Sequence, residues 1–305
     1  MKVLVTGGSG FIGSHLVDAL IVAGHDVTVI DSVEPRKDNQ NPKAEYVRIN
    51  LLDERLKSVF TRVQPEILFH FAAHIDDRAS VGIPFFNARE NILGSLNVFE
   101  SARLTGGIKK ILFASTSVVY GSAEEKAFTE KVIPQPLTPY GISKLACEYY
   151  LHFYLTTYGI PYVAFRLANV YGPRQDTSKE CGATAIFTSK LLRGEQPFMN
   201  NDGQTVRDYI YVTDVIGVYL KAMESNVTGV FNCGTGKGTT TEELYKLVAE
   251  AVHSDMKPVL RPDVHDQVKR SIMRSTLARK VFSWRPKVSL EKGIHDTVEW
   301  YKGRV

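Results

Sequence analysis

Short apolar runs alternate with longer amphipathic segments through the first half of the chain. The apolar runs occupy residues 3–6, 27–31, 46–49, 67–71, 111–115 and 162–166. Segments with helical periodicity lie between them, at residues 11–23, 87–104 and 140–158. This alternation predicts an α/β fold in which parallel strands are joined by crossover helices. Because the strands are apolar along their whole length, we expect helices on both faces, as in a doubly wound parallel sheet.

The second half of the chain has a less regular pattern. Prolines and glycines interrupt short segments after residue 166, a strand–helix pair is expected at residues 207–223, and helices are expected at 241–253 and 290–301. We therefore predict a sheet domain of residues 1–166, to which residues 206–232 return. Residues 167–205 and 233–305 are expected to form a smaller C-terminal lobe.

Composition and charge narrow the classes of protein. Of the 305 residues 44% are hydrophobic and 23% charged, which is ordinary for a globular protein. The formal net charge of +4 is small and the basic residues are scattered, so no nucleic-acid partner is expected. No apolar stretch reaches membrane-spanning length, and we expect a cytoplasmic protein without a membrane partner. Cys147, Cys181 and Cys233 lack metal-ligand spacing, so we expect three reduced thiols and no metal site.

A glycine-rich segment, TGGSGFIG at residues 6–13, lies directly between the first expected strand and the first expected helix. Glycines at this point permit a tight turn and close approach of the backbone to a pyrophosphate at the helix N-terminus. The context predicts a Rossmann-type dinucleotide-binding fold. Asp31 ends the second strand, where a carboxylate favours NAD over NADP, while Arg36 and Lys37 keep an NADP alternative open.

Three residues form a candidate catalytic group. Tyr140 and Lys144 are four residues apart and share one helix face, where the ammonium group would lower the pKa of the phenol. Such a pair alone is more typical of a solvated helix surface, but its position after the fifth strand favours general acid/base chemistry. Thr116 falls at the carboxyl end of that strand, where ligands bind in such folds; the alternative is that Ser115, Thr116 and Ser117 only cap the strand.

Together these segments resemble the extended short-chain dehydrogenases, in particular the NAD-dependent nucleotide-sugar epimerase/dehydratase family. The resemblance covers essentially the whole chain, and it rests on residues 6–13, 31, 69–73, 91, 115–121, 140–144, 166–174 and 203–214. It implies NAD as cofactor, an NAD-binding Rossmann domain and a nucleotide-sugar-binding lobe.

The resemblance also assigns expected roles to individual residues. Residues expected to contact the cofactor are Gly7, Gly10, Phe11, Ile12, Gly13, Asp31, Leu52, Asp53, Phe71, Ala72, Ala73, Asn91, Tyr140 and Lys144. Residues expected to contact the substrate are Ser115, Thr116, Tyr140, Asn169, Arg207, Arg270 and Ser271. Thr116, Tyr140 and Lys144 are the expected catalytic residues.

The residues after Thr116 bear on the reaction. Family members that dehydrate or decarboxylate sugars carry a carboxylate in this segment, whereas here Ser117 and Val118 follow. Since valine cannot transfer a proton, the resemblance implies 4-epimerisation of a UDP-hexose such as UDP-glucose through a transient 4-keto sugar. The small side chain of Ser271 suggests room for an N-acetyl group, so UDP-N-acetylglucosamine is a further expected substrate.

Two other functions stay open at this point. A nucleotide-sugar reductase would use the same residues but would consume the nicotinamide cofactor stoichiometrically. A non-catalytic NAD-sensing regulator is compatible with the fold, since fold alone does not fix function. The resemblance also implies a homodimer, formed through the helices expected at residues 87–104 and 139–158, although apolar stripes on these helices fit a sheet-facing core equally well.

Overall fold

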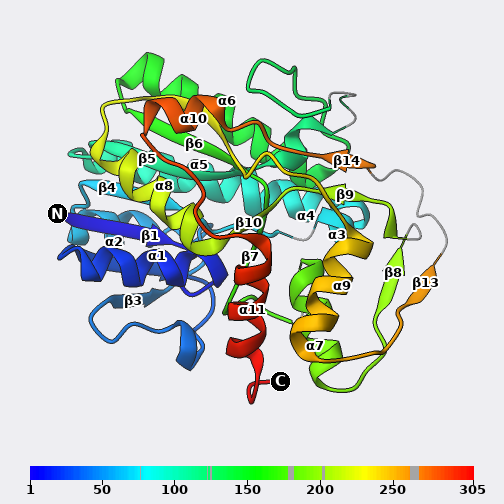
Figure 1. The fold of residues 1–305 in the computed structure, drawn as a ribbon. Helices are drawn as coiled ribbons and strands as arrows, with labels where there is room; N and C mark the ends of the chain where they lie inside the picture. The colour runs from blue at the N-terminus through cyan, green and yellow to red at the C-terminus, as the bar shows by residue number, and fades with distance from the viewer. Residues whose placement is uncertain (76, 122, 124–125, 178–181, 201–202, 262–267) are drawn as a thin grey trace.

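The architecture was obtained as a computed structural model that describes residues 1–75, 77–121, 123, 126–177, 182–200, 203–261 and 268–305 (Figure 1). Its central element is a sheet of seven parallel strands in the order β11-β6-β5-β4-β1-β2-β3. These strands are β1 (Lys2–Thr6), β2 (Asp26–Asp31), β3 (Glu45–Arg48), β4 (Ile67–His70), β5 (Lys110–Thr116), β6 (Tyr162–Leu167) and β11 (Gly229–Cys233). The predicted doubly wound parallel sheet is thereby confirmed.

Side chains alternate between the two faces along each strand, because successive Cβ atoms of a strand point to opposite sides. One face carries Val3 and Val5 and packs against α1 (Phe11–Val22) and α8 (Val212–Glu224). The other carries Leu4 and packs against α2 (Leu56–Val63), α5 (Gly94–Thr105) and α6 (Pro139–Tyr158). Both faces are thus covered, which explains the continuous apolar runs of the strands.

The helix expected at residues 87–104 is divided into three parts. It consists of α4 (Pro84–Ala88), a π-helical turn η2 (Arg89–Leu93) and α5. The shorter helices on the sheet domain are η1 (Lys37–Asn39), α3 (Asp77–Gly82) and η3 (Ser117–Tyr120). A π-helical turn inside an α-helix is uncommon and often marks a functional site.

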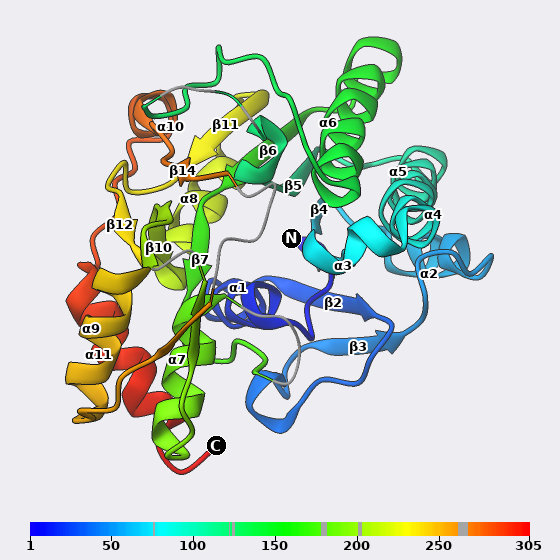
Figure 2. The ribbon, with the colours of Figure 1, turned by 90° about the vertical axis from the view of Figure 1, so that its right-hand side faces the viewer.

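The C-terminal lobe has its own apolar core, between α7 (Ala183–Leu192), α9 (Thr241–Val252) and α11 (Leu290–Tyr301). Figure 2 shows these three helices beside one another, away from α5 and α6. Three small sheets accompany them: β7 (Asn169–Tyr171) with β10 (Tyr209–Tyr211); β12 (Thr239–Thr240), β9 (Val206–Arg207) and β14 (Arg270–Ser271); and β8 (Phe198–Asn200) with β13 (Val259–Arg261). Helix α10 (Thr276–Val281) packs on the sheet domain instead.

Residues 206–232 divide between the two regions. Helix α8 and strand β11 lie on the central sheet, where β11 pairs with β6. Strands β9 and β10 belong to small sheets instead. The exact division of the chain into two domains stays a prediction.

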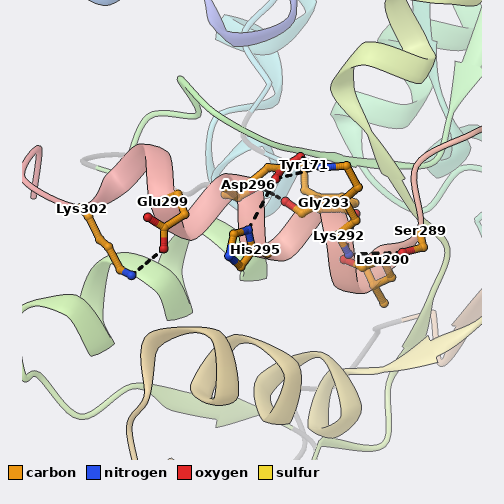
Figure 3. A network of polar contacts seen from close by, with 10 residues as sticks. Tyr171, Ser289, Leu290, Lys292, Gly293, His295, Asp296, Glu299 and Lys302 are labelled. Carbon is orange, nitrogen blue, oxygen red and sulfur yellow. Dashed lines mark hydrogen bonds and ion pairs between the residues drawn. The ribbon is translucent and has the colours of Figure 1, made fainter.

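Polar and close apolar contacts hold α11 against β7 (Figure 3). The Ser289 side chain caps the helix N-terminus by accepting a hydrogen bond from Lys292 N. Tyr171 of β7 donates from its hydroxyl group to the Leu290 carbonyl oxygen at 3.3 Å. It lies so near Gly293 that an added Cβ there would be 2.2 Å from the Tyr171 hydroxyl oxygen. The α11 backbone therefore approaches β7 as closely as glycine permits.

Candidate active site

The glycine-rich loop joins β1 to α1 at the carboxyl edge of the sheet, beside the point where the strand order reverses between β1 and β4. Gly7 has a φ of +74°, and a Cβ there would lie 2.5 Å from Ala72 N. A Cβ on Gly13 would lie 2.2 Å from the Gly7 carbonyl oxygen. No side chain caps the first turn of α1, whose N-cap is Gly10. This cradle fits the pyrophosphate of a dinucleotide, which a helix N-terminus attracts.

Asp31 lies at the end of β2, beside the glycine-rich loop. Its carboxylate accepts hydrogen bonds from Ser9 N at 3.1 Å and from Val33 N at 3.3 Å. Burial raises the pKa of Asp31, although these backbone hydrogen bonds act in the opposite direction. The carboxylate thus links the end of β2 to the glycine-rich loop, where the ribose of NAD is expected.

Arg36 is one of the residues that left NADP as an alternative cofactor. In the structure it contacts the segment after β7. Its guanidinium group donates to the Arg174 carbonyl oxygen at 2.7 Å and lies 3.6 Å from an Asp176 carboxylate oxygen. The same segment reaches α1 through an ion pair of 2.7 Å between Arg174 and Asp18. Arg36 therefore contacts protein groups, which makes its half-exposed guanidinium group less available to a 2′-phosphate.

The remaining expected cofactor residues lie on the neighbouring turns. Phe71, Ala72 and Ala73 follow β4, and the Phe71 ring packs against Tyr219 of α8 with a centroid distance of 4.7 Å. Leu52 and Asp53 follow β3, where hydrogen bonds from the Arg55 side chain lower the pKa of Asp53 to about 2.

Thr116, Tyr140 and Lys144 come together where β5 ends and α6 begins. All three are buried or largely buried, and a hydrogen bond joins the Tyr140 hydroxyl group to the Thr116 side chain. Burial raises the pKa of Tyr140, the charge of Asp77 raises it further, and the Thr116 hydrogen bond lowers it. Lys144 Nζ donates to the Ala114 carbonyl oxygen at 2.8 Å, and burial lowers its pKa to about 8. The expected lowering of the Tyr140 pKa is thus not found in the protein alone.

Helix α3 holds the first turn of α6. The Thr138 hydroxyl group donates to the Asp77 carboxylate and accepts from Gly141 N at 3.2 Å, which makes Thr138 the N-cap of α6. The Ser80 hydroxyl oxygen accepts from Tyr140 N at 3.3 Å. These contacts fix the backbone that carries Tyr140.

Ser115 is expected to contact the substrate, and in the structure its side chain contacts α6. Its hydroxyl group donates to Glu148 Oε1 of α6 at 2.5 Å, on the face of the sheet opposite to Thr116. Glu148 also forms a buried ion pair of 2.7 Å with Arg166 of β6. Burial alone would lower the pKa of Arg166, but the hydrogen bonds and charge of Glu148 outweigh it and raise this pKa. Ser115, Glu148 and Arg166 thus connect α6 to β5 and β6, beneath the candidate catalytic residues.

The expected substrate residues of the C-terminal half converge on the small sheets. Ser271 pairs with Arg207 across β14 and β9. Asn169 begins β7, and its backbone N–H group donates to the Asp208 carbonyl oxygen at 2.9 Å. Arg270 is the exception, since its side chain is exposed and donates to the Lys126 carbonyl oxygen at 3.1 Å.

Asp208 is a residue of this region that the sequence patterns did not single out. Its buried carboxylate accepts from the backbone N–H groups of Thr235, Gly236 and Met273 at 2.9 to 3.2 Å, and from the Thr235 hydroxyl group at 2.5 Å. It therefore joins the loop after β11 to the segment after β14 and holds Arg207 beside Ser271. The signal in the sequence that could have indicated Asp208 is an acidic residue between the two short strands β9 and β10.

Asn91 is expected to contact the cofactor, and in the structure its side chain forms hydrogen bonds with protein groups. Its side-chain oxygen accepts from His74 N at 2.7 Å. Its amide nitrogen donates to the His74 carbonyl oxygen at 3.0 Å and to Ser143 Oγ at 3.1 Å. Asn91 thus connects the turn after β4 to α6.

The fold and these contacts define a dinucleotide-binding α/β protein with a tyrosine–lysine pair at the sheet edge. A model of the NAD dependent epimerase/dehydratase family matches residues 3–234, and the chain belongs to this family. The family predicted from the sequence is thereby confirmed.

Full-length relatives agree with this assignment. A UDP-glucose 4-epimerase of Mycolicibacterium smegmatis is 37% identical over 311 residues, covering 100% of this chain and 99% of that protein. The UDP-glucose 4-epimerase of Thermotoga maritima, solved with UDP-glucose, is 43% identical with a TM-score of 0.97, covering 100% of this chain and 99% of the other. The UDP-glucose 4-epimerase of Thermus thermophilus, solved with NAD, is 37% identical with a TM-score of 0.94, and the match covers 100% of both chains.

Proposed function

We propose that this chain is an NAD-dependent UDP-sugar 4-epimerase that interconverts UDP-glucose and UDP-galactose. The observation that carries the proposal is the convergence of Thr116, Tyr140 and Lys144 at the carboxyl end of β5, two strands from β1 and on the same edge of the sheet as the glycine-rich loop. The full-length similarity to UDP-glucose 4-epimerases supports the choice of reaction.

The chain's own residues supply the proton chemistry of epimerisation. NAD, when bound, supplies a reversible acceptor for the hydrogen at C4 of the sugar. Tyr140 would act as the phenolate, a form that the positive charges of Lys144 and of the oxidised cofactor would favour once NAD is bound. The phenolate takes the proton of the 4-hydroxyl group and returns it after the sugar has turned its other face to the site. Thr116 hydrogen-bonds the same oxygen atom, and Lys144 remains charged at pH 7 because its pKa stays near 8. No further acid or base is required, which fits the presence of Val118 after Ser117.

The substrate lobe holds the nucleotide while the sugar turns. Arg207 offers a planar guanidinium group suited to an anionic diphosphate, and Asn169 is joined through its backbone N–H group to Asp208, the residue after Arg207. Ser271, whose side chain is small, lies opposite Arg207 and leaves room at the C2 substituent. We therefore include UDP-N-acetylglucosamine among the substrates.

The experiment is an incubation of the purified protein with UDP-glucose, and separately with UDP-N-acetylglucosamine, without added cofactor. NMR of the products should show the corresponding galacto sugars. No conversion even after addition of NAD would refute the proposal, and stoichiometric cofactor consumption would instead indicate a reductase. A Ser271→Tyr variant should lose activity on the acetylated sugar selectively; an unchanged ratio would refute the assignment of Ser271.

A homodimer and a cytoplasmic location are part of the proposal. Support for the dimer comes from large apolar side chains exposed on α4, η2 and α6, including Phe85 at 81%, Leu93 at 54% and Tyr149 at 66%. In the described part of the chain, no helix combines the length and the apolar character needed to cross a membrane. Light scattering should give twice the chain mass, and a Phe85→Lys, Tyr149→Lys double variant should give the monomer mass.

A further inference from the structure

His70 ends β4 beneath the glycine-rich loop, and the proton chemistry proposed above does not use it. The side chain is completely buried, and both of its ring nitrogens have partners. Nδ1 lies 2.5 Å from Thr6 Oγ1 of β1, and Nε2 lies 2.8 Å from Ser95 Oγ of α5. Its ring packs between Phe99 and Phe113, with centroid distances of 5.5 and 5.6 Å. A polar ring at this position is therefore enclosed by apolar groups and by two hydroxyl groups.

The carbonyl oxygen of Asn91, at one end of this series, determines which group donates in each hydrogen bond. Ser95 Oγ lies 2.5 Å from the Asn91 carbonyl oxygen, which can only accept, so the Ser95 hydroxyl group donates there. Ser95 must then accept from the His70 Nε2–H group. Burial, followed by the charge of Lys144, lowers the pKa of His70 to about 3, so the ring is neutral and Nδ1 accepts from the Thr6 hydroxyl group. The other side of Thr6 Oγ1 accepts from Ala72 N at 3.4 Å.

The chain of hydrogen bonds continues to the helix that carries the candidate acid/base. The Asn91 side chain donates to Ser143 Oγ at 3.1 Å, and the Ser143 hydroxyl group donates to the Tyr140 carbonyl oxygen at 2.8 Å. Asn91 belongs to the π-helical turn, which brings its carbonyl oxygen to Ser95 and its side chain to α6. Hydroxyl, imidazole and amide groups thus connect the end of β1 to the first turn of α6.

We infer that His70 is a positioning residue, a neutral, Nε2-protonated link that fixes the cofactor-binding loop relative to the helix that carries Tyr140. The ring has one donor and one acceptor, and the order of its partners permits one tautomer only. Each hydrogen bond is directional, so the chain sets the separation of its two ends more sharply than apolar packing does. The kinetic consequence rests on the proposed function, whereas the tautomer and its effect on cofactor binding do not.

The first test is NMR of the wild-type protein labelled with nitrogen-15 in its histidines. The His70 signals are those missing from the spectrum of a His70→Phe variant, among the eight histidines of the chain. We expect a neutral ring protonated at Nε2, unchanged from pH 5 to pH 9. A ring protonated at Nδ1, or one that becomes charged in this range, would overturn the inference.

The second test compares a variant that keeps the ring shape with one that keeps the polarity. His70→Phe should lower kcat about tenfold or more, within the ~100-fold that a misplaced reacting group can cost, with little change of KM for UDP-glucose. It should also weaken NAD binding, measured by calorimetry. His70→Gln should recover part of both losses, because the amide retains a donor and an acceptor.

The matched control is Phe99→Leu, which disturbs the packing against the His70 ring but leaves the hydrogen bonds. This variant should have a lower unfolding free energy than wild type. Its NAD affinity and its kcat should stay close to the wild-type values. Equal losses in Phe99→Leu and His70→Phe, or a folded His70→Phe variant with wild-type NAD affinity, would overturn the inference. If the wild type binds NAD but does not convert UDP-glucose, the proposed function fails while the NMR and binding measurements still decide the role of His70.

Discussion

The Lys144 ammonium group donates a hydrogen bond to the Ala114 carbonyl oxygen of β5 at 2.8 Å. It lies 4.7 Å from the centre of the Phe113 ring and is almost completely buried. The helix that carries Tyr140 is thereby anchored to the strand that carries Thr116. The arrangement places a charged group in a poorly solvated site, which has a cost that depends on pH.

Lys144→Met should reveal this cost. The pKa of Lys144 is about 8 in the folded protein against 10.5 for an ordinary lysine. Between these values the unfolded chain holds a proton that the folded protein has released, so wild-type stability gains from rising pH. From pH 7 to pH 10 the unfolding free energy of wild type should rise relative to Lys144→Met by on the order of 2 kcal/mol. Denaturant titrations check this, and a constant difference would show that the lysine is not desolvated.

Glu148 and Arg166 form a buried ion pair, so the stability cost of replacing one residue should depend on whether the other is present. Glu148→Gln or Arg166→Met alone should lower the unfolding free energy by about 3–5 kcal/mol, because each leaves an unpaired buried partner. The double variant should lose clearly less unfolding free energy than the sum of the losses in the two single variants. Ser115→Ala should cost about 1–3 kcal/mol through the hydrogen bond that it removes from Glu148. Additive single effects in denaturant titrations would contradict this account of the group.

Cofactor choice should respond to the contacts of Arg36. Asp176→Asn weakens the hold on the guanidinium group and makes it more available to a 2′-phosphate. The ratio of NADP to NAD affinity should rise, by no more than about fivefold, since a partly exposed ion pair is worth up to ~1 kcal/mol. Competition binding measures the ratio. Glu299→Gln, which removes the Lys302 ion pair on α11, is the control and should leave the ratio unchanged; a rise in both variants would contradict a specific role of Asp176.

Replacing either of two glycines by alanine should change the unfolding free energy, and the two changes should have opposite signs. Gly293→Ala places a Cβ 2.2 Å from the Tyr171 hydroxyl oxygen and should lower the unfolding free energy by about 1–3 kcal/mol. The loss should shrink in a Tyr171→Phe background. Gly217→Ala in α8, where the nearest atom is 3.8 Å away, should raise the unfolding free energy by about 0.5–1 kcal/mol, as expected inside a helix. Thermal unfolding compares them, and equal effects would contradict the packing of α11.

Local sequence patterns were sufficient to predict the sheet domain and part of the candidate active site. The glycine-rich loop follows from residues adjacent in sequence, and Tyr140 and Lys144 share a helix face because of their spacing. The alternation along β5 also bears on Ser115, whose expected contact with the substrate stays a prediction. Neighbouring residues of this strand point to opposite faces, so Ser115 and Thr116 have different surroundings, and the Ser115 side chain meets Glu148 of α6.

Contacts between distant residues account for what the sequence did not predict. Arg36 is held by Arg174 and Asp176, which no local pattern connects to it. Strand β10 pairs with β7 rather than with the central sheet, because Tyr209 and Tyr211 pack with Tyr171 in the core of the C-terminal lobe. His70 was part of an apolar strand pattern, and its role depends on hydroxyl groups from β1 and α5.

The fate of the hydrogen at C4 tests the proposed epimerisation most directly. UDP-glucose deuterated at C4 is incubated with the purified protein in ordinary water, and the product is analysed by NMR and mass spectrometry. We expect UDP-galactose that keeps its deuterium at C4, because this hydrogen leaves and returns as hydride, which does not exchange with water. Tyr140→Phe should convert the same substrate about 10²–10⁴-fold more slowly. Loss of the deuterium to solvent, or a Tyr140→Phe variant as active as wild type, would contradict the account.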